Sequence, residues 1–283
     1  MSRSRKILAL GIVALLVLTA GIWYAAWKED RGGILTVSFL DVGQGDSIFI
    51  DSPSGRQVLI DGGLSAQVIR ALGKRMPWWD RSIDVVVATH PDADHISGLV
   101  DVLARYDVGM IVRSSIAGDS QIAQAFEESM RSEKADLHIA MRGQIIDLGG
   151  AYLEILSPDR DMRAVEANTG SVVARLVYGK TAFMLTGDAP QGIEKYLVSL
   201  DGGSLRSDVL KAGHHGSKTS SAPPFIGFVD PAYAVFSRGC DNRYGHPAPE
   251  VVERFRQFGV PTLDTCEEGT ITFVSDGAKV LKK

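Results

Sequence analysis

The chain has 283 residues, of which 45% are hydrophobic and 23% charged, which suits one large globular domain or two small ones. Its formal net charge is −4. This acidic balance argues against a protein that coats nucleic acid through a broad basic surface. It does not exclude an enzyme that handles a phosphodiester at a metal site.

The N-terminus predicts a membrane anchor. A basic tip, MSRSRK, precedes an uncharged apolar stretch from Ile7 to Trp27. As a helix this stretch would span roughly 30 Å, about one bilayer core, with the basic tip in the cytoplasm and the rest exported. Trp23, Tyr24 and Trp27 are expected at the membrane interface. The alternative is a signal peptide cleaved near Ala26, which would release a secreted protein.

The remaining chain alternates between strand and helix patterns, so we expect residues 1–33 to be tip, anchor and linker and 34–283 to form one domain. Short β-branched and aromatic runs predict strands, and longer amphipathic runs predict helices. In chain order we expect strands at 35–42, 47–51 and 56–63, a helix at 65–76, a strand at 83–90, a helix at 95–105, a strand at 109–114, a helix at 120–132, strands at 137–141, 151–157, 171–179 and 180–188, a helix after residue 190, a strand at 207–213, a helix at 223–229, a strand at 232–238, a helix at 248–258 and a strand at 269–275. This mixture predicts two sheets with helices outside.

The two cysteines leave their state open. Cys240 and Cys266 can form one disulfide in an exported protein, or remain two unpaired thiols. Two cysteines this far apart do not resemble a zinc-thiolate site.

Ionisable residues follow four of the predicted strands: Asp61, His90, Asp188 and His214. In layered α/β folds the carboxyl ends of strands open into the ligand crevice. We therefore expect these four side chains to meet at one edge of the fold.

The stretch HPDADH places four metal-capable side chains in six positions: His90, Asp92, Asp94 and His95. Such a turn can offer one pair of ligands to each of two metal ions about 3.5–4 Å apart. The alternative is a solvated loop in which Asp94 caps the next helix. Capping leaves both histidines unexplained, so we predict a metal site.

Two later stretches supply the rest of the expected site. Asp188 in LTGDAP can bridge two metal ions, or instead cap the helix that starts at Pro190. In KAGHHGSKTSS we assign His214 as the ligand, because it comes first after the strand, and His215 to catalysis beside His246. Asp94 is both a predicted ligand and a catalytic residue. The predicted substrate-binding residues are Asn168, Ser171, Ser217, Lys218, Tyr244 and His246. The alternative for Ser217 and Lys218 is a mobile polar loop, and the alternative for Tyr244 and His246 is a turn that starts a helix.

These motifs together resemble the metallo-β-lactamase superfamily, and within it the exported hydrolase domain of ComEC-type DNA-uptake proteins. The resemblance runs from Leu35 to Val274 and rests on FLDVGQGDSIFI, VLIDGG, THPDADHISGL, FMLTGD, VLKAGHHGSKTSS and NRYGHPAPEVVERF. It implies a four-layer αββα sandwich with a dinuclear centre between its sheets. It also implies that Asp188 bridges the metals and that Asp61 supports the metal loop from behind. Asp46 is assigned the same supporting position.

The sequence departs from the superfamily at the first metal site. Asp92 stands where the second histidine of the metal turn is usual, and the histidine between the turn and the bridging aspartate is missing. His138 lies there, but its alternating apolar context indicates a strand residue. Asn168 and Ser171 are expected to occupy the corresponding loop.

The expected cofactors are one or two divalent ions. Three aspartates beside the histidines make zinc and manganese both suitable. We expect a membrane-anchored phosphodiesterase, with nucleic acid as substrate and the DNA-uptake machinery as partner. The alternatives are hydrolysis of a cell-envelope phosphodiester or other ester, and a non-catalytic DNA-uptake partner with a degenerate site.

Overall fold

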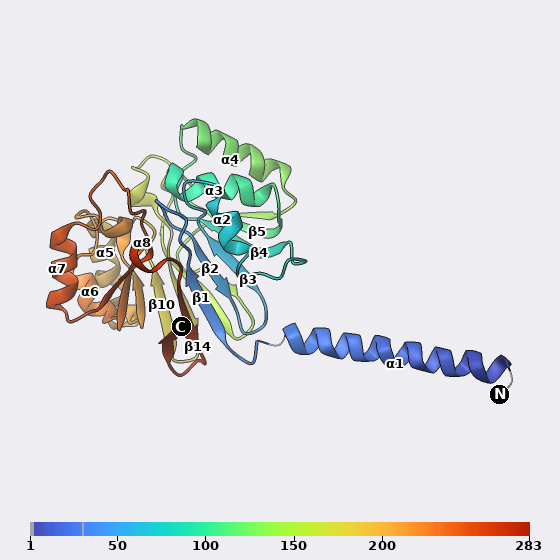
Figure 1. The fold of residues 1–283 in the computed structure, drawn as a ribbon. Helices are drawn as coiled ribbons and strands as arrows, with labels where there is room; N and C mark the ends of the chain where they lie inside the picture. The colour runs from blue at the N-terminus through green and yellow to red at the C-terminus, as the bar shows by residue number, and fades with distance from the viewer. Residues whose placement is uncertain (1–2, 30) are drawn as a thin grey trace.

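The computed structural model describes residues 3–29 and 31–283. Helix α1 (Arg3–Glu29) projects away from the folded domain (Figure 1). Its segment Ser4–Trp23 has a mean hydropathy of 2.2 and no buried side chain, which makes it a candidate membrane span or signal sequence. The side chains of Tyr24 and Trp27, predicted at the interface, lie outside the described residues, as do residues 1 and 2 of the basic tip.

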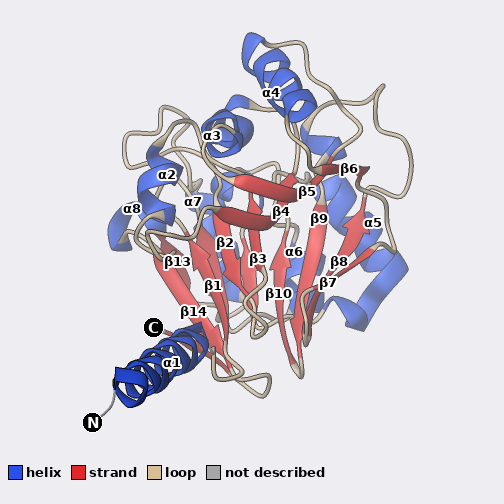
Figure 2. Cartoon of the chain, turned by 90° about the vertical axis from the view of Figure 1, so that its right-hand side faces the viewer, coloured by secondary structure: helices blue, strands red, loops and turns tan. Residues whose placement is uncertain are grey.

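The described residues after α1 build two sheets (Figure 2). The order of the first is β15 (Val280–Lys282), β14 (Ile271–Ser275), β1 (Leu35–Phe39), β2 (Ile48–Asp51), β3 (Gln57–Ile60), β4 (Ser82–Ala88), β5 (Asp107–Arg113), β6 (Asp136–Ile139). The order of the second is β13 (Thr262–Asp264), β12 (Tyr233–Phe236), β11 (Val209–Lys211), β10 (Thr181–Leu185), β9 (Val173–Tyr178), β8 (Ala151–Ser157), β7 (Ile145–Asp147).

Helices cover the outer face of each sheet (Figure 1). The first sheet carries α2 (Gln67–Leu72), α3 (Ala93–Leu103) and α4 (Gln121–Ser132), and the second carries α5 (Gln191–Asp201), α6 (Pro223–Val229) and α7 (Pro249–Gln257). Strand β4 shows why: Val85 and Val87 enter the core between the sheets, while Val86 and Ala88 pack under the helices. The four layers confirm the predicted αββα sandwich, whereas the division at residue 33 stays a prediction.

Parallel pairing places the carboxyl ends of several strands at one edge. Strands β3 to β6 are parallel in the first sheet, and β10 to β13 are parallel in the second. The loops that follow these strands carry the polar clusters seen in the sequence. The fold therefore brings them to one edge, between the two sheets.

The structure corrects several predicted elements. Strands β7, β13 and β15 were not expected, because runs of three residues carry almost no periodic signal. Helix α3 begins at Ala93, and Asp92 rather than Asp94 holds its N-cap position. Helix α5 begins at Gln191 with Pro190 at its N-cap, so Asp188 does not cap it.

The two cysteines are paired. A disulfide joins Cys240, in the loop after β12, to Cys266 in α8 (Thr265–Glu268). The loop that contains Asn242, Tyr244 and His246 therefore starts from a fixed point.

Candidate metal centre

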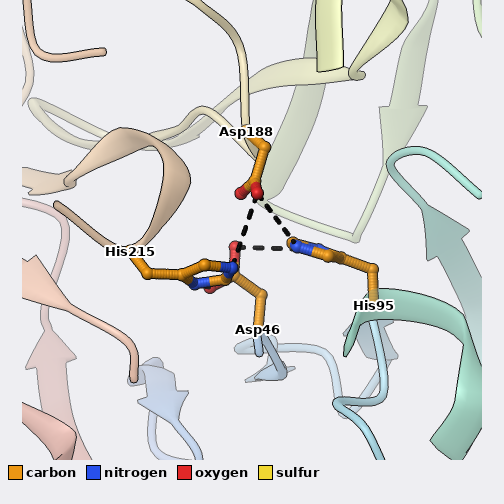
Figure 3. A group of neighbouring side chains, drawn as sticks. All are labelled: Asp46, His95, Asp188 and His215. Carbon is orange, nitrogen blue, oxygen red and sulfur yellow. Dashed lines mark ion pairs between the residues drawn. The ribbon is translucent and has the colours of Figure 1, made fainter. Parts of the chain in front are cut away.

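Three histidine side chains converge on one carboxylate, two from the segment that runs from β4 into α3 and one from the turn after β11. His95 lies in the first turn of α3, His90 two residues after β4, and His215 in the turn η3 (Gly213–Gly216) after β11. The Nε2 atoms of His95 and His215 are each 3.4 Å from Oδ2 of Asp188, and that of His90 is 4.0 Å away. Figure 3 shows Asp188 with His95 and His215.

The inward-facing nitrogen atoms lack hydrogen bonds to the part of the chain that the structure describes. The Nε2 atoms of His90, His95 and His215 are buried and lack a hydrogen-bond partner among the described residues. Buried polar atoms are normally satisfied, so three such atoms around one carboxylate need an explanation. A cation among them would satisfy all three. The residues present therefore fit a divalent metal ion.

The hydrogen bond made by Nδ1 of each ring fixes its tautomer, and so decides whether Nε2 can bind a metal. Nδ1 of His215 donates to the carbonyl oxygen of Ser237 at 2.8 Å, and Nδ1 of His95 donates to Oδ2 of Asp61 at 2.8 Å. A carbonyl and a carboxylate can only accept, so in the neutral rings the lone pair is on Nε2. These are the tautomers that metal ligation requires.

Asp61 organises the metal turn from behind, in a left-handed backbone conformation with φ 57°. Its carboxylate accepts from the backbone N–H of Thr89 at 2.8 Å and from the Thr89 hydroxyl at 2.7 Å. The same hydroxyl lies 3.0 Å from Nδ1 of His90, and because its proton goes to Asp61 it accepts from that nitrogen. One buried carboxylate thus orients His90 and His95.

A buried lysine at the back of the cluster was not predicted. Lys211, the last residue of β11, is fully buried, and its Nζ forms an ion pair with Asp46, donates to the carbonyl oxygen of Gly187 at 2.9 Å and lies 3.5 Å from Oδ1 of Asp188. Burial opposes its charge, but Asp46 and Asp188 outweigh burial and raise the pKa of Lys211. The signal in the sequence was the single lysine within the apolar run VLKAG.

Asp46 also lies behind the imidazoles. Its carboxylate is 3.2 Å from Nδ1 of His215 and 4.0 Å from Nδ1 of His95, whereas the free Nε2 atoms of both rings face Asp188. Asp46, His95, Asp188 and His215 form one buried group of potential ligands. Because Asp46 faces Nδ1 atoms and pairs with Lys211, its position is that of a supporting residue.

A model of the metallo-beta-lactamase superfamily matches residues 40–239. This chain belongs to the metallo-β-lactamase superfamily. It is 31% identical over 258 residues to ComE operon protein 3 of Bacillus subtilis and 34% identical over 245 residues to competence protein ComA of Neisseria gonorrhoeae. Each alignment covers 84% of this chain and 32% of the relative, so the chain spans about a third of the length of these relatives. The predicted resemblance to ComEC-type competence proteins is confirmed.

Solved structures show the same fold at low identity. The metallo-beta-lactamase fold protein YhfI from Bacillus subtilis gives a TM-score of 0.56 at 13% identity, over 85% of this chain and 99% of its own. CmlA, a diiron beta-hydroxylase from Streptomyces venezuelae, gives 0.58 at 13% identity, over 88% and 54%. At this identity they establish the metallo-β-lactamase fold and nothing about the reaction.

The residues of the candidate centre divide into two groups that both lie beside Asp188. Around one side lie His95, His215 and Asp94, whose Oδ2 is 3.2 Å from Nε2 of His215. On the other side lie His90 and Asp92, with 3.6 Å between Nε2 and Oδ2. The Asp92 side chain is about half exposed. The second group therefore has fewer buried candidate ligands, in line with the missing histidine.

The histidine pair does not follow the expected order. Both His214 and His215 have left-handed backbone conformations, so the alternation of a strand does not apply to them. His215 is buried and faces Asp94 and Asp188, whereas the His214 side chain is 27% exposed and its Nε2 is 3.6 Å from Oδ2 of Asp188. The geometry favours His215 as the buried ligand and places His214 at the rim.

The predicted substrate residues divide between buried and accessible positions. Ser171 is buried, and its hydroxyl accepts from the backbone N–H of Asp188 at 3.3 Å, so it supports that residue. Ser217 is buried and accepts from Thr219. Asn168 is partly buried and its Oδ1 has no partner among the described residues. The residues that remain accessible are Lys218, Tyr244 and, in part, His246.

His138, the histidine between the metal turn and Asp188, lies on β6 as expected. It lines a separate hollow together with Arg56 and Asp136.

Metal binding is expected to release protons. Burial opposes protonation of the two buried rings, but Asp188 and the other carboxylates outweigh it, which raises the pKa of His95 well above its usual value and that of His215 to about 10. Without metal both rings are therefore cationic at neutral pH, with a second proton on Nε2. A metal ion must displace that second proton in order to bind. Calorimetry of Mn²⁺ binding in two buffers of different ionisation enthalpy should show proton release, with affinity rising with pH below about 10. A heat that is the same in both buffers would contradict this, and His138→Ala should not alter the result.

Replacing Asp61 by asparagine is expected to weaken metal binding about 10- to 100-fold, the usual effect of losing an orienting partner. The amide cannot accept from both Thr89 and His95 as the carboxylate does. Competition with a fluorescent chelator measures the affinity. Asp84→Asn is a matched control, because Asp84 accepts the N–H of Gln57 at 2.7 Å outside the cluster. Equal losses in both variants would show a general effect on the fold.

Proposed function

We propose that this chain is a metal-dependent phosphodiesterase that cleaves nucleic-acid strands. The observation that carries the proposal is the convergence on Asp188 of three buried Nε2 atoms that have no hydrogen-bond partner among the described residues, and that offer lone pairs to a metal once the rings are neutral. The names of the two relatives, ComE operon protein 3 and competence protein ComA, support a nucleic-acid substrate. Involvement in DNA uptake is part of the same proposal.

The proposed ligands are His90 and Asp92 on one side and Asp94, His95 and His215 on the other, with Asp188 between them. His214 is retained as a rim ligand or substrate contact. One or two divalent ions, Mn²⁺ or Zn²⁺, would supply Lewis-acid activation of water and stabilise charge on the phosphoryl oxygens when bound. The carboxylates make the set suitable for manganese, and the imidazoles make it suitable for zinc.

The other residues position and shield the reacting groups. Lys211 and Asp61 hold the carboxylates and rings in place from the buried side. His246 lies at the open side, where its ring centroid is 5.7 Å from that of His214. We propose that His246 contacts the leaving-group oxygen, and that His215, which was predicted to act in catalysis beside it, is instead a ligand. Burial of His215 among carboxylates supports its reassignment as a ligand.

The proposal is tested on the full chain purified in detergent. Elemental analysis gives the bound metal, and single-stranded DNA, RNA and a small phosphodiester are each assayed with Mn²⁺, Zn²⁺, Mg²⁺ and EDTA. We expect EDTA-sensitive cleavage of nucleic acid. Cleavage of the small ester alone would favour a cell-envelope substrate. No cleavage with any metal would favour a non-catalytic partner, which the ligand-poor side of the centre also suggests.

We also propose that α1 anchors the chain and that the domain lies on the extracytoplasmic side. The uncharged exposed segment of α1 and the Cys240–Cys266 disulfide support this location, because disulfides persist in oxidising compartments. Intact mass spectrometry of the chain from membranes distinguishes a retained anchor from a cleaved signal peptide. A mature mass that starts after Ala26 would replace anchoring with secretion.

A further inference from the structure

A row of flat side chains extends outward from the metal centre along the loop after β12. The rings of Tyr244 and His246 are nearly parallel, with an interplanar angle of 16° and centroids 5.8 Å apart. The guanidinium carbon of Arg243 lies 5.4 Å from the centroid of the Tyr244 ring. At the inner end His246 contacts His214, whose Nε2 is 3.6 Å from Asp188. The row therefore connects the carboxylate at the centre to solvent.

The loop is held in shape, although its outer ring is exposed. Asn242 accepts from the backbone N–H of His246 at 2.9 Å and donates to the carbonyl oxygens of His246 and Gly239. The disulfide at Cys240 fixes the start of the loop. Tyr244 nevertheless remains 57% exposed. Because the loop is already held in one conformation, little conformational entropy is lost when a ligand binds to this ring. A large exposed aromatic ring on such a loop favours binding of a flat partner.

The chemistry of the row selects the partner. Nucleobases stack on aromatic side chains whatever their sequence, and an arginine beside the ring adds a cation–π contribution and attracts phosphate. Bases inside a duplex have both faces occupied, so only an unpaired base can lie on Tyr244. His246 also has a buried Nδ1 without a partner among the described residues. These features match a single strand better than a duplex.

We propose that Tyr244 and His246 form a stacking platform for one base of a single-stranded polynucleotide, next to the phosphodiester at the metal centre. This inference rests on the proposed phosphodiesterase function and names its substrate class. Arg243 lies at the outer end of the row, where it would contact the sugar–phosphate backbone of the next nucleotide. The Tyr244 ring determines affinity for strands with bases and takes no part in bond cleavage, whereas His246 both supports that ring and contacts the leaving-group oxygen.

The test compares two strands that differ only in their bases. Full-length protein in detergent is assayed with a fluorescein-labelled oligothymidylate and with an abasic strand of equal length, both in Mn²⁺. Tyr244→Ala is expected to raise KM for the oligothymidylate about 5- to 150-fold, the range for losing one stacked base, with kcat retained. KM for the abasic strand should not change. Tyr244→Phe keeps the ring and should behave as wild type.

Tyr196→Ala is the matched control, because Tyr196 is a partly exposed tyrosine on α5, outside the loop. Equal changes in KM for both strands, or no change for either, would overturn the platform. Thermal melting and metal content identify a variant that has lost its fold.

A measurement of binding distinguishes failure of the stacking proposal from failure of the proposed hydrolase activity. Fluorescence anisotropy measures the affinity of both strands without turnover, in an Asp188→Asn background. If wild-type protein cleaves neither strand but Tyr244→Ala weakens binding of the oligothymidylate alone, the platform stands and the hydrolase proposal fails. If binding does not depend on Tyr244, the platform is wrong, whatever the activity.

Discussion

Replacement of Asp188 by asparagine is expected to lower the rate of the proposed phosphodiester cleavage on the order of 10³-fold, because a bound metal would contribute several kcal/mol of transition-state stabilisation. Among the described residues, Oδ2 of Asp188 is the one carboxylate oxygen that the Nε2 atoms of His90, His95 and His215 all approach. Asparagine keeps the size of the side chain and removes its charge. Metal content by elemental analysis should fall together with kcat.

Asp101→Asn is the matched control, because Asp101 lies on α3 and pairs with Arg105 at the surface. Full activity is expected in that variant. If Asp188→Asn retained both metal and turnover, Asp188 would not be a ligand and the centre would have to be reassigned. Loss of turnover with full metal content would limit Asp188 to a role in positioning the substrate.

Replacement of Lys211 by methionine is expected to lower the free energy of unfolding of the metal-free protein by about 3–5 kcal/mol, the usual effect of removing one partner from a buried ion pair. The ammonium group lies between Asp46 and Asp188, and both carboxylates are buried. Methionine fills similar space without the charge. Urea unfolding in EDTA, followed by fluorescence, measures the loss.

Bound metal should reduce the loss of unfolding free energy in Lys211→Met. A divalent ion at the centre places positive charge beside Asp188, so the loss in Lys211→Met should be smaller in saturating Mn²⁺ than in EDTA. Lys195→Met, on the surface helix α5, should change neither value. An equal loss with and without metal would show that Lys211 is independent of the centre. Unchanged stability in EDTA would contradict the pairing itself.

Lys211 also explains how so many carboxylates can be buried together. Burial raises the pKa of Asp188, but His215, His95 and Lys211 outweigh it and hold that pKa well below its usual value. The carboxylate is therefore ionised and able to bind a cation. Part of the positive charge at the centre is thus present whether or not a metal ion is bound. It comes from Lys211 on strand β11 and not from the loops that carry the motifs.

Much of the centre followed from the sequence because its signals are local. HPDADH places His90, Asp92, Asp94 and His95 within six positions, and a strand followed by a turn brings them to one edge whatever the distant contacts are. The order of strand and helix patterns predicted two sheets with helices outside for the same reason, and the resemblance to the superfamily implied the four-layer αββα arrangement. Elements of three residues, such as β7 and β15, were missed because they are defined by their neighbours in the sheet.

Tertiary structure alone decided the assignments that depend on direction or on distant partners. His214 and His215 lie in left-handed conformations, so no strand or helix period tells which ring is buried. The Asp46–Lys211 pair and the Cys240–Cys266 bond join residues far apart in the chain, and residue type does not reveal such proximity. Motifs determine which chemical groups are present, because they are local. The burial and orientation of each group depend on packing between the two sheets, which is a property of the whole fold.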